Sequence, residues 1–313
     1  MGKVIAQRLL SLVFVIFSIT FLTFIVGYLA PGDPILVLLG PRRDPQVYNN
    51  LRHLYGLDQP WYQQYFTYIT NLLHGNLGLS YRYQNRTVNQ ILGNGVWVSI
   101  KLGGMALLLS LLIGIPAGIF SALRQNSWLD RLNMTVMLAL FSIPSFVLIP
   151  VVRAFNYFVF YQHNLPSLPA AGWGSAAHWV MPVLVLAAAN VGYIARLTRS
   201  SLLETLQQDY VRTANAKGLP RRRIVYVHAL RNALLPIVTV IGPSLAFLVT
   251  GAFVVESLFA IPGIGFLSVQ SIAQRDYPVI QGTTVILATA VVLMNLLTDI
   301  VYTLLDPRIE AEG

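Results

Sequence analysis

Six long apolar segments are the feature that most restricts how this chain can fold. They cover residues 9–30, 97–122, 132–160, 179–199, 236–255 and 283–305. A helix rises about 1.5 Å per residue, so each segment is long enough to cross the ~30 Å hydrocarbon core of a bilayer. Of the 313 residues, 55% are apolar and only 11% are charged, which is about half the charged share of a soluble globular protein. The sequence therefore predicts an all-α, polytopic membrane protein with six transmembrane helices in one transmembrane domain, residues 1–313.

Basic residues orient these spans. The first apolar segment exceeds the roughly 7–15 apolar residues of a cleaved signal peptide, so a retained first helix is expected. Thirteen Lys or Arg residues then fall on one side of the membrane: Lys3, Arg8, Arg124, Arg131, Arg196, Arg199, Arg212, Lys217, Arg221, Arg222, Arg223, Arg231 and Arg308. The short loops on the other side hold only Arg275. The positive-inside rule therefore places both termini in the cytoplasm.

The interval 31–96 is polar and mixed, and this orientation places it outside the membrane. Pro31-Gly32-Asp33-Pro34 ends the first helix by turn chemistry. The scattered aromatic residues that follow predict a small helical extracytoplasmic insert, which we expect to contact an external partner or to cap the pathway. Its arginines do not contradict the orientation, because the rule fails for loops of about this length.

The interval 200–235 is the longest polar interval in the second half of the chain, and its chemistry favours helices. Ser201-x-x-Glu204 fits a capping box at a helix start. Asp209 is expected to cap a second helix, 211–217, which Gly218 would end. A third helix is expected over 224–232, before Pro236 opens the next apolar segment.

Parts of this interval resemble a known motif. Thr213-Ala214-Asn215-Ala216-Lys217-Gly218, followed by His228-Ala229-Leu230-Arg231-Asn232 and Leu235-Pro236, is similar to the EAA loop of bacterial ATP-binding-cassette importer permeases. Arg212 stands where that motif has its eponymous Glu, and Gly218 lies eighteen residues before Pro236, a longer gap than usual. Both departures are typical of the peptide and nickel subgroup of these permeases.

Further clusters resemble the same subgroup. They are Pro31-Gly32-Asp33-Pro34, Gly56-Leu57-Asp58-Gln59-Pro60, His74-Gly75-Asn76-Leu77-Gly78-Leu79-Ser80, Glu256-Ser257-Leu258-Phe259-Ala260-Ile261-Pro262-Gly263-Ile264-Gly265 and Arg275-Asp276-Tyr277-Pro278-Val279. The resemblance thus covers nearly the whole chain.

The resemblance implies a permease subunit of an ATP-driven importer for oligopeptides or dipeptides in the bacterial cytoplasmic membrane. Nickel, glutathione or another small solute remains an alternative cargo. The implied partners are a second homologous permease in a heterodimer, two cytoplasmic ATPase subunits and an extracytoplasmic peptide-binding protein. The implied mechanism is alternating access. The chain itself would be no enzyme and would bind no cofactor, because ATP and Mg would be held by the ATPase subunits.

The resemblance also implies which residues matter. The loop between the fourth and fifth spans would form a coupling helix that docks in a groove of the ATPase, and its expected residues are Asp209, Tyr210, Arg212, Thr213, Ala214, Ala216, Lys217, Gly218 and Leu219. The small side chains of Ala214 and Ala216 would suit a close approach to that groove. The alternative from the residues alone is a basic loop attracted to anionic lipid headgroups.

Six residues are candidates for the pathway or a gate: Arg153, Glu256, Pro262, Gly263, Arg275 and Asp276. Proline and glycine break any helix across 256–282, and the apolar residues between them suggest a hairpin that dips against protein. An ordinary outside loop is the alternative. Arg153 would lie near the outer edge of the hydrocarbon, where it snorkels, finds a structural partner or contacts a substrate carboxylate. Asp299 is expected to have an internal hydrogen-bonding partner rather than to relay protons.

Several classes of chemistry find no support in the sequence. It contains no G-x-x-x-x-G-K-[ST] phosphate loop, no H-E-x-x-H and no G-x-S-x-G, so no catalytic residue is assigned. The five histidines lack metal-ligand spacing, and the absence of cysteine excludes disulfides and thiolate metal sites. The net charge of +9 lies mostly in the loops and makes no case for nucleic acid. A stand-alone secondary transporter or channel is the rival hypothesis, but the inverted repeats and paired acids of that class are not evident.

The orientation gives a first testable prediction. Cysteines introduced at Gly2, next to Met1, and at Gly313 should be protected from a membrane-impermeant thiol reagent in intact cells and labelled after permeabilisation. The chain has no native cysteine, so the background is clean. Labelling of either terminus in intact cells would contradict six spans with both ends inside.

Overall fold

The computed structural model of the chain describes residues 2–40, 44–83 and 85–305, which are mostly helical. Within these ranges the only β-type pairing is one antiparallel bridge between Leu79 and Thr87. Met1, Gly313 and Arg308, on which the expected orientation partly depends, lie outside the described residues, and so does the side chain of Asp299. The chain divides into two compact units. The first holds residues up to 100 together with 260–292, and the second holds 101–259 together with the residues from 293 onward.

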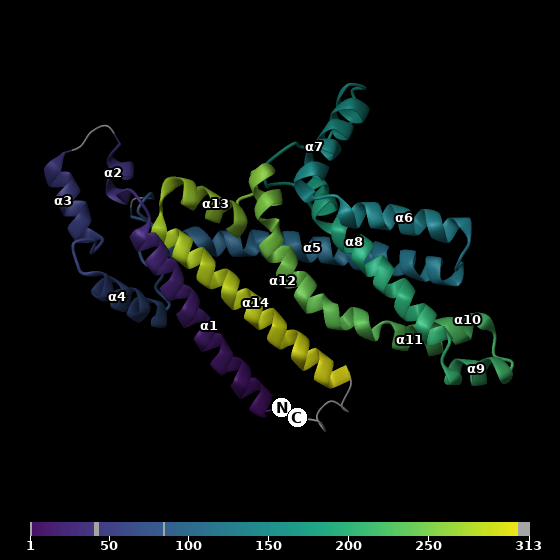
Figure 1. Cartoon of the computed structure of the whole chain (residues 1–313). Helices are drawn as coiled ribbons and strands as arrows, with labels where there is room; N and C mark the ends of the chain where they lie inside the picture. Colours follow the sequence, from purple (N-terminus) through teal and green to yellow (C-terminus); the bar gives the residue numbers. More distant parts are fainter. Residues whose placement is uncertain (1, 41–43, 84, 306–313) are drawn as a thin grey trace. The chain divides into compact units, whose positions relative to one another are not determined.

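The first unit contains the amino-terminal helix, the helices of the insert and a short helix near the carboxyl end of the sequence (Figure 1). Its helices are α1 (Gly2–Leu29), α2 (Pro34–Leu39), α3 (Pro45–Leu54), α4 (Trp61–Leu73), α13 (Ile264–Gln274), and the first parts of α5 (Val88–Leu123) and α14 (Tyr277–Leu305).

Local chemistry explains where the insert's helices begin. The carboxylates of Asp33 and Asp44 accept the Ile35 and Gln46 N–H groups at 2.8 Å, and a proline occupies the first helical position after each. These are strong helix-start signals. Tyr65 then fixes α4 against α1, because its ring packs on Phe21 and Phe24.

The second unit contains most of the remaining helices. They are α6 (Trp128–Ser142), α7 (Ser145–Phe155), the π-helix η1 (Asn156–Tyr161), α8 (Ala176–Leu206), α9 (Asp209–Ala216), α10 (Arg221–Arg223), the π-helix η2 (Ile224–Ala229), α11 (Leu230–Ala233), α12 (Leu235–Leu258), and the later parts of α5 and α14.

Glycines allow the long helices of this unit to approach closely. A Cβ atom at Gly192 of α8 would overlap the Met137 carbonyl oxygen of α6. A Cβ atom at Gly118 of α5 would overlap the Thr198 side chain of α8 in the same way. Small residues at such crossings are typical of helices that associate in membranes.

Several of these helices are candidates for crossing the membrane. Four are long and apolar enough to cross a bilayer: Leu10–Leu29, Val88–Leu123, Ala176–Leu206 and Tyr277–Thr298. Two further segments qualify if each bent pair of helices counts as one span, which brings the number to six. The all-helical membrane fold expected from the apolar segments is confirmed.

The third apolar segment differs most from its expected form. Residues 132–160 were expected as one kinked span, but α6 and the helical run Ser145–Tyr161 meet at 110°. The break falls at Ile143 and Pro144, whose backbones are extended. Proline lacks an N–H group and disfavours helical geometry in the residue before it, so the helix ends there. Pro150, the other expected kink, lies inside α7.

Candidate functional site

The coupling loop is organised around α9, a helix of eight residues. Asp209 was expected to cap this helix, and that expectation is wrong. Gln208 is the capping residue, without a side-chain bond, and Asp209 is the first helical residue. Its negative charge still favours the helix start through the helix dipole. Its 3.4 Å contact with Arg212 joins two exposed side chains and adds little stability.

The expected capping box upstream is also wrong. α8 runs without a break to Leu206, so Ser201 and Glu204 lie within its last turns. The Ser201 carbonyl accepts a bond from the Thr205 hydroxyl at 2.7 Å, inside the helix. Helix continuation is favoured here because Leu202, on the same stretch, is fully buried. Tertiary packing outweighs a local start signal.

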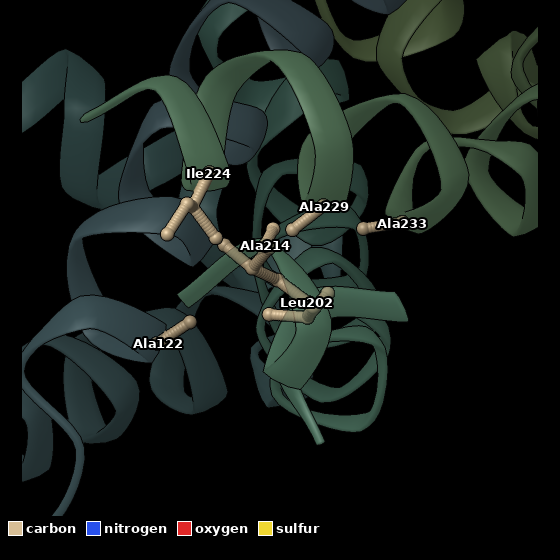
Figure 2. Packing of buried hydrophobic residues seen from close by; sticks show 7 residues of the cluster. Ala122, Leu202, Ala214, Ile224, Ala229 and Ala233 are labelled. Atoms are coloured by element: carbon tan, nitrogen blue, oxygen red, sulfur yellow. The ribbon is translucent and has the colours of Figure 1, made fainter. Parts of the chain in front are cut away.

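One face of α9 is buried in a small apolar core, which we call the coupling core. It consists of Ala122, Leu202, Val211, Ala214, Ile224, Ala229 and Ala233, so it joins α5, α8, α9, η2 and α11. Figure 2 shows Ala214 between Leu202 and Ile224, with Ala229 and Ala233 beside it. Ala214 was expected to face a partner groove. Its burial inside the chain contradicts that expectation, and its small size instead allows α9 to approach α8 and η2.

The other face of α9 is exposed. It carries most of the residues expected in the coupling site: Asp209, Tyr210, Arg212, Thr213, Ala216, Lys217 and Gly218. Leu219 is half-buried and packs against the coupling core. Gly218 has a φ of +73° and donates its N–H to the Asn215 carbonyl at 2.9 Å. That left-handed conformation ends α9, as expected from the sequence, and Pro220 then precedes α10.

A second helical run follows α9 and supports it. The helix expected over 224–232 is continuous from Arg221 to Ala233 through α10, η2 and α11. The Asn232 amide donates to the Tyr210 hydroxyl at 2.8 Å, which ties α11 to the start of α9. Beside this bond lies a hollow of ≈ 490 Å³ that Val227, His228 and Arg231 help to line. α9 and η2–α11 therefore form one continuous exposed surface.

Arg153, a candidate pathway residue, is engaged with backbone. Its guanidinium donates to the carbonyls of Leu258, at 2.6 Å, and Ala170, at 2.8 Å. It also lies over the Phe259 ring, 4.7 Å from the centroid. These contacts fasten α7 to the end of α12. They favour the structural partner among the expected alternatives.

The candidates around 256–263 lie at helix ends. Glu256 is fully buried in the last turn of α12. Pro262 is exposed, and Gly263 is the capping residue of α13, an 11-residue helix within the segment expected as a hairpin or loop. The Ser99 hydroxyl of α5 accepts the Ile264 N–H at 2.9 Å, so the first turn of α13 is satisfied by a side chain.

Asp276 is buried, and it holds the insert to the corner before α14. Its carboxylate accepts the Ser80 hydroxyl at 2.5 Å, the Tyr81 N–H at 3.0 Å and the Arg82 N–H at 3.3 Å. Burial, together with the nearby Asp276 carboxylate, raises the pKa of the Tyr81 phenol, so that phenol stays neutral. Almost two hundred positions separate residues 80–82 from Asp276, so no local pattern in the sequence indicates that they meet.

Arg275, the neighbouring candidate, does not join that network. It takes the left-handed conformation with a φ of 55° and ends α13. Its guanidinium lies against Gly32, where a Cβ atom would overlap it. Gly32 itself has a φ of +102°, so both its conformation and its lack of a side chain are required here.

Another pair was missed by sequence reasoning. Arg199 of α8 makes a two-pronged bond to Asp130 of α6, with Nε to Oδ1 at 2.8 Å and Nη2 to Oδ2 at 2.7 Å. From the sequence alone, Arg199 is only one of the charges that orient the spans, and Asp130 has no assigned role. Among the described residues no cluster of three His, Asp or Glu side chains could hold a metal ion.

Comparison with known proteins now gives the family. Residues 114–311 match the family described as binding-protein-dependent transport system inner membrane component, and residues 1–90 match its amino-terminal component. The chain belongs to this family. It is therefore a multi-pass permease of an ATP-driven, binding-protein-dependent importer, which confirms the resemblance of its motifs.

Individual relatives agree with that assignment. The permease is 41% identical to the dipeptide transport system permease protein of Bacillus subtilis, over 99% of this chain and 98% of that protein. It is 39% identical to the oligopeptide transport system permease protein of Haemophilus influenzae, over 99% of each. The fold is similar to a chain of the inward-facing MetNI methionine ABC transporter, with a TM-score of 0.59, 20% identity, and coverage of 69% and 97% of the two chains.

The Asp276 network generates a prediction. Asp276→Ala should loosen the insert, because it leaves three donors without their acceptor, at a cost of about 1–3 kcal/mol for each group that stays buried and unsatisfied. Limited proteolysis of the purified importer should show new cleavage near residues 80–87. Asp44→Ala is the control, because it removes an exposed helix cap worth about 1 kcal/mol in the same unit. Equal protease resistance of the two variants would contradict the role of Asp276.

Proposed function

We propose that this permease forms half of the pathway by which dipeptides or oligopeptides enter a bacterial cell. The observation that carries the proposal is the match to two peptide permeases along essentially the full length of the chain. We propose that it pairs with a second, homologous permease as a heterodimer. An extracytoplasmic peptide-binding protein would deliver the cargo, and the insert, residues 31–96, would contact that protein or cap the pathway.

We further propose that α9 couples the permease to an ATPase. Its exposed residues Tyr210, Arg212, Thr213 and Lys217 would dock on a separate cytoplasmic ATPase subunit, which holds ATP and Mg. The opposite face of α9 is fixed in the coupling core, so a movement of the ATPase would pass to α5 and α8 rather than be lost in a flexible loop. Alternating access would follow from the reorientation of these spans.

The contacts of the candidate pathway residues favour structural roles over contact with the substrate. Arg153 binds two carbonyls and an aromatic face, which favours fastening α7 to α12 over contact with a substrate carboxylate. Asp276 and Arg275 contact the insert, so we propose that they position it. Pro262 and Gly263 separate α12 from α13, and Glu256 lies at the end of α12; we propose that this corner is part of the external gate.

A peptide-length series tests the substrate. The purified importer with its binding protein should take up labelled di- to hexapeptides into proteoliposomes in an ATP-dependent way, with one range of lengths preferred. Nickel and free amino acids are the matched controls and should not be accumulated. Uptake of nickel instead of any peptide, or uptake without ATP, would contradict the proposal and favour the alternative cargo or a stand-alone transporter.

Gly218 tests the coupling. Gly218→Asp and Gly218→Asn add side chains of equal size, and both residues tolerate the left-handed conformation at a cost of about 1 kcal/mol. No other atom lies within 4 Å of a Cβ built at Gly218, so the protein itself has room for either side chain. We expect Gly218→Asp to lose its ATPase subunits or the stimulation of ATP hydrolysis by loaded binding protein, because it places a negative charge at the docking face. Gly218→Asn should lose less. Unchanged stimulation and uptake in Gly218→Asp would mean that α9 is not the coupling element.

A further inference from the structure

Three non-covalent contacts join α5, α6 and α8 in the second unit. The first is the backbone approach of α5 and α8 at Gly118 and Thr198. The second comes from Asn133 of α6, whose amide donates to the Ala117 carbonyl at 2.9 Å and the Ser121 hydroxyl at 2.8 Å, both on α5. The third is the Asp130–Arg199 pair between α6 and α8.

The ion pair between Asp130 and Arg199 is the most specific of these contacts. Only 3% of the Asp130 side chain is exposed, and 26% of Arg199. Asp130 also accepts the Asn126 N–H at 3.0 Å, so its carboxylate is held by three donors on two sides. Two parallel charge-assisted bonds fix both the distance and the orientation of the groups they join. Such a contact is a stiff link, whereas an apolar contact would slide.

The position of this link matters more than its strength. Arg199 precedes Leu202 by three residues, which is one turn of α8, and Leu202 is fully buried in the coupling core. Asp130 lies in the first turn of α6, directly after the turn that connects α5 to α6. The coupling core contains residues of α5, α8 and α9 but none of α6. The ion pair thus links α6 to the coupling core.

We propose that Asp130 and Arg199 are positioning residues that make α6 follow the movement of the coupling core. The proposal rests on the proposed coupling role of α9 and extends it to a helix that contributes no residue to the coupling core. A buried ion pair often adds little net stability compared with apolar residues of the same size. A role in orientation accounts for this geometry better than a role in stability.

The test uses the complete importer in proteoliposomes. Asp130→Asn and Arg199→Gln remove the charges at nearly constant size, and Arg199→Lys keeps the charge without the two-pronged geometry. Arg131→Gln is the control, because Arg131 is an exposed neighbour that lines the same 360 Å³ hollow as Asp130 and Arg199. We expect both neutral variants to retain their ATPase subunits. The stimulation of ATP hydrolysis by loaded binding protein should fall at least about fivefold, which is the lower end of the typical range for coupling between two sites. The double variant should lose no more than either single one, since the pair acts as a unit.

A second readout does not depend on peptide. A fluorophore on Gln125→Cys, in the exposed α5–α6 turn of a chain without native cysteine, should respond to ATP in the wild type and in Arg131→Gln. The response should be lost in Arg199→Gln and reduced in Arg199→Lys. A response retained in both neutral variants, or activity that falls only in proportion to the amount of assembled complex, would overturn the proposal. No response in the wild-type importer would instead contradict the coupling role of α9 itself.

Discussion

The burial of one face of α9 is the contact on which the exposed surface of the loop between α8 and α12 depends. Eight residues are too few for a stable isolated helix in water, because helix nucleation costs more than so short a helix returns. Val211 and Ala214 supply the missing stability by packing into the coupling core. Every exposed residue of α9 is therefore placed by two buried ones, and the exposed side remains available for a partner.

In the first unit, too, a buried residue holds other parts of the chain in place. Asp276 is buried, and it organises a stretch of the insert through a hydroxyl and two backbone N–H groups. Arg275, one residue earlier, lies against Gly32 at the end of α1. A short corner before α14 thereby fixes two separate parts of the chain's amino-terminal third. Arg153 likewise joins two parts of the chain, because it donates to the carbonyls of Ala170 and Leu258.

Helix boundaries show where local signals are sufficient and where they are overruled. Asp33-Pro34 and Asp44-Pro45 start helices as their chemistry predicts, because each carboxylate accepts an N–H group of the first turn. Ser201-x-x-Glu204 carries an equally good start signal but lies inside α8, since Leu202 is buried by long-range contacts. At Pro144 the sequence predicts a kink at the correct position, but the change of direction is larger than a kink, because the two helical segments meet at 110°. A proline fixes where a helix ends, whereas packing fixes the direction in which the next helix leaves.

The sequence by itself determined the membrane fold, the family and the place of α9. The fold follows from the length of the apolar segments, the family from the motif clusters and the end of α9 from Gly218, and each of these is a property of neighbouring residues. Only the tertiary structure decided that Ala214 faces inward, that Ser80 donates a hydrogen bond to Asp276 and that Arg199 forms an ion pair with Asp130. These contacts join residues that are distant along the chain, so no periodicity or local propensity encodes them. They depend on how the helices pack, which a single sequence specifies only through all of its residues together.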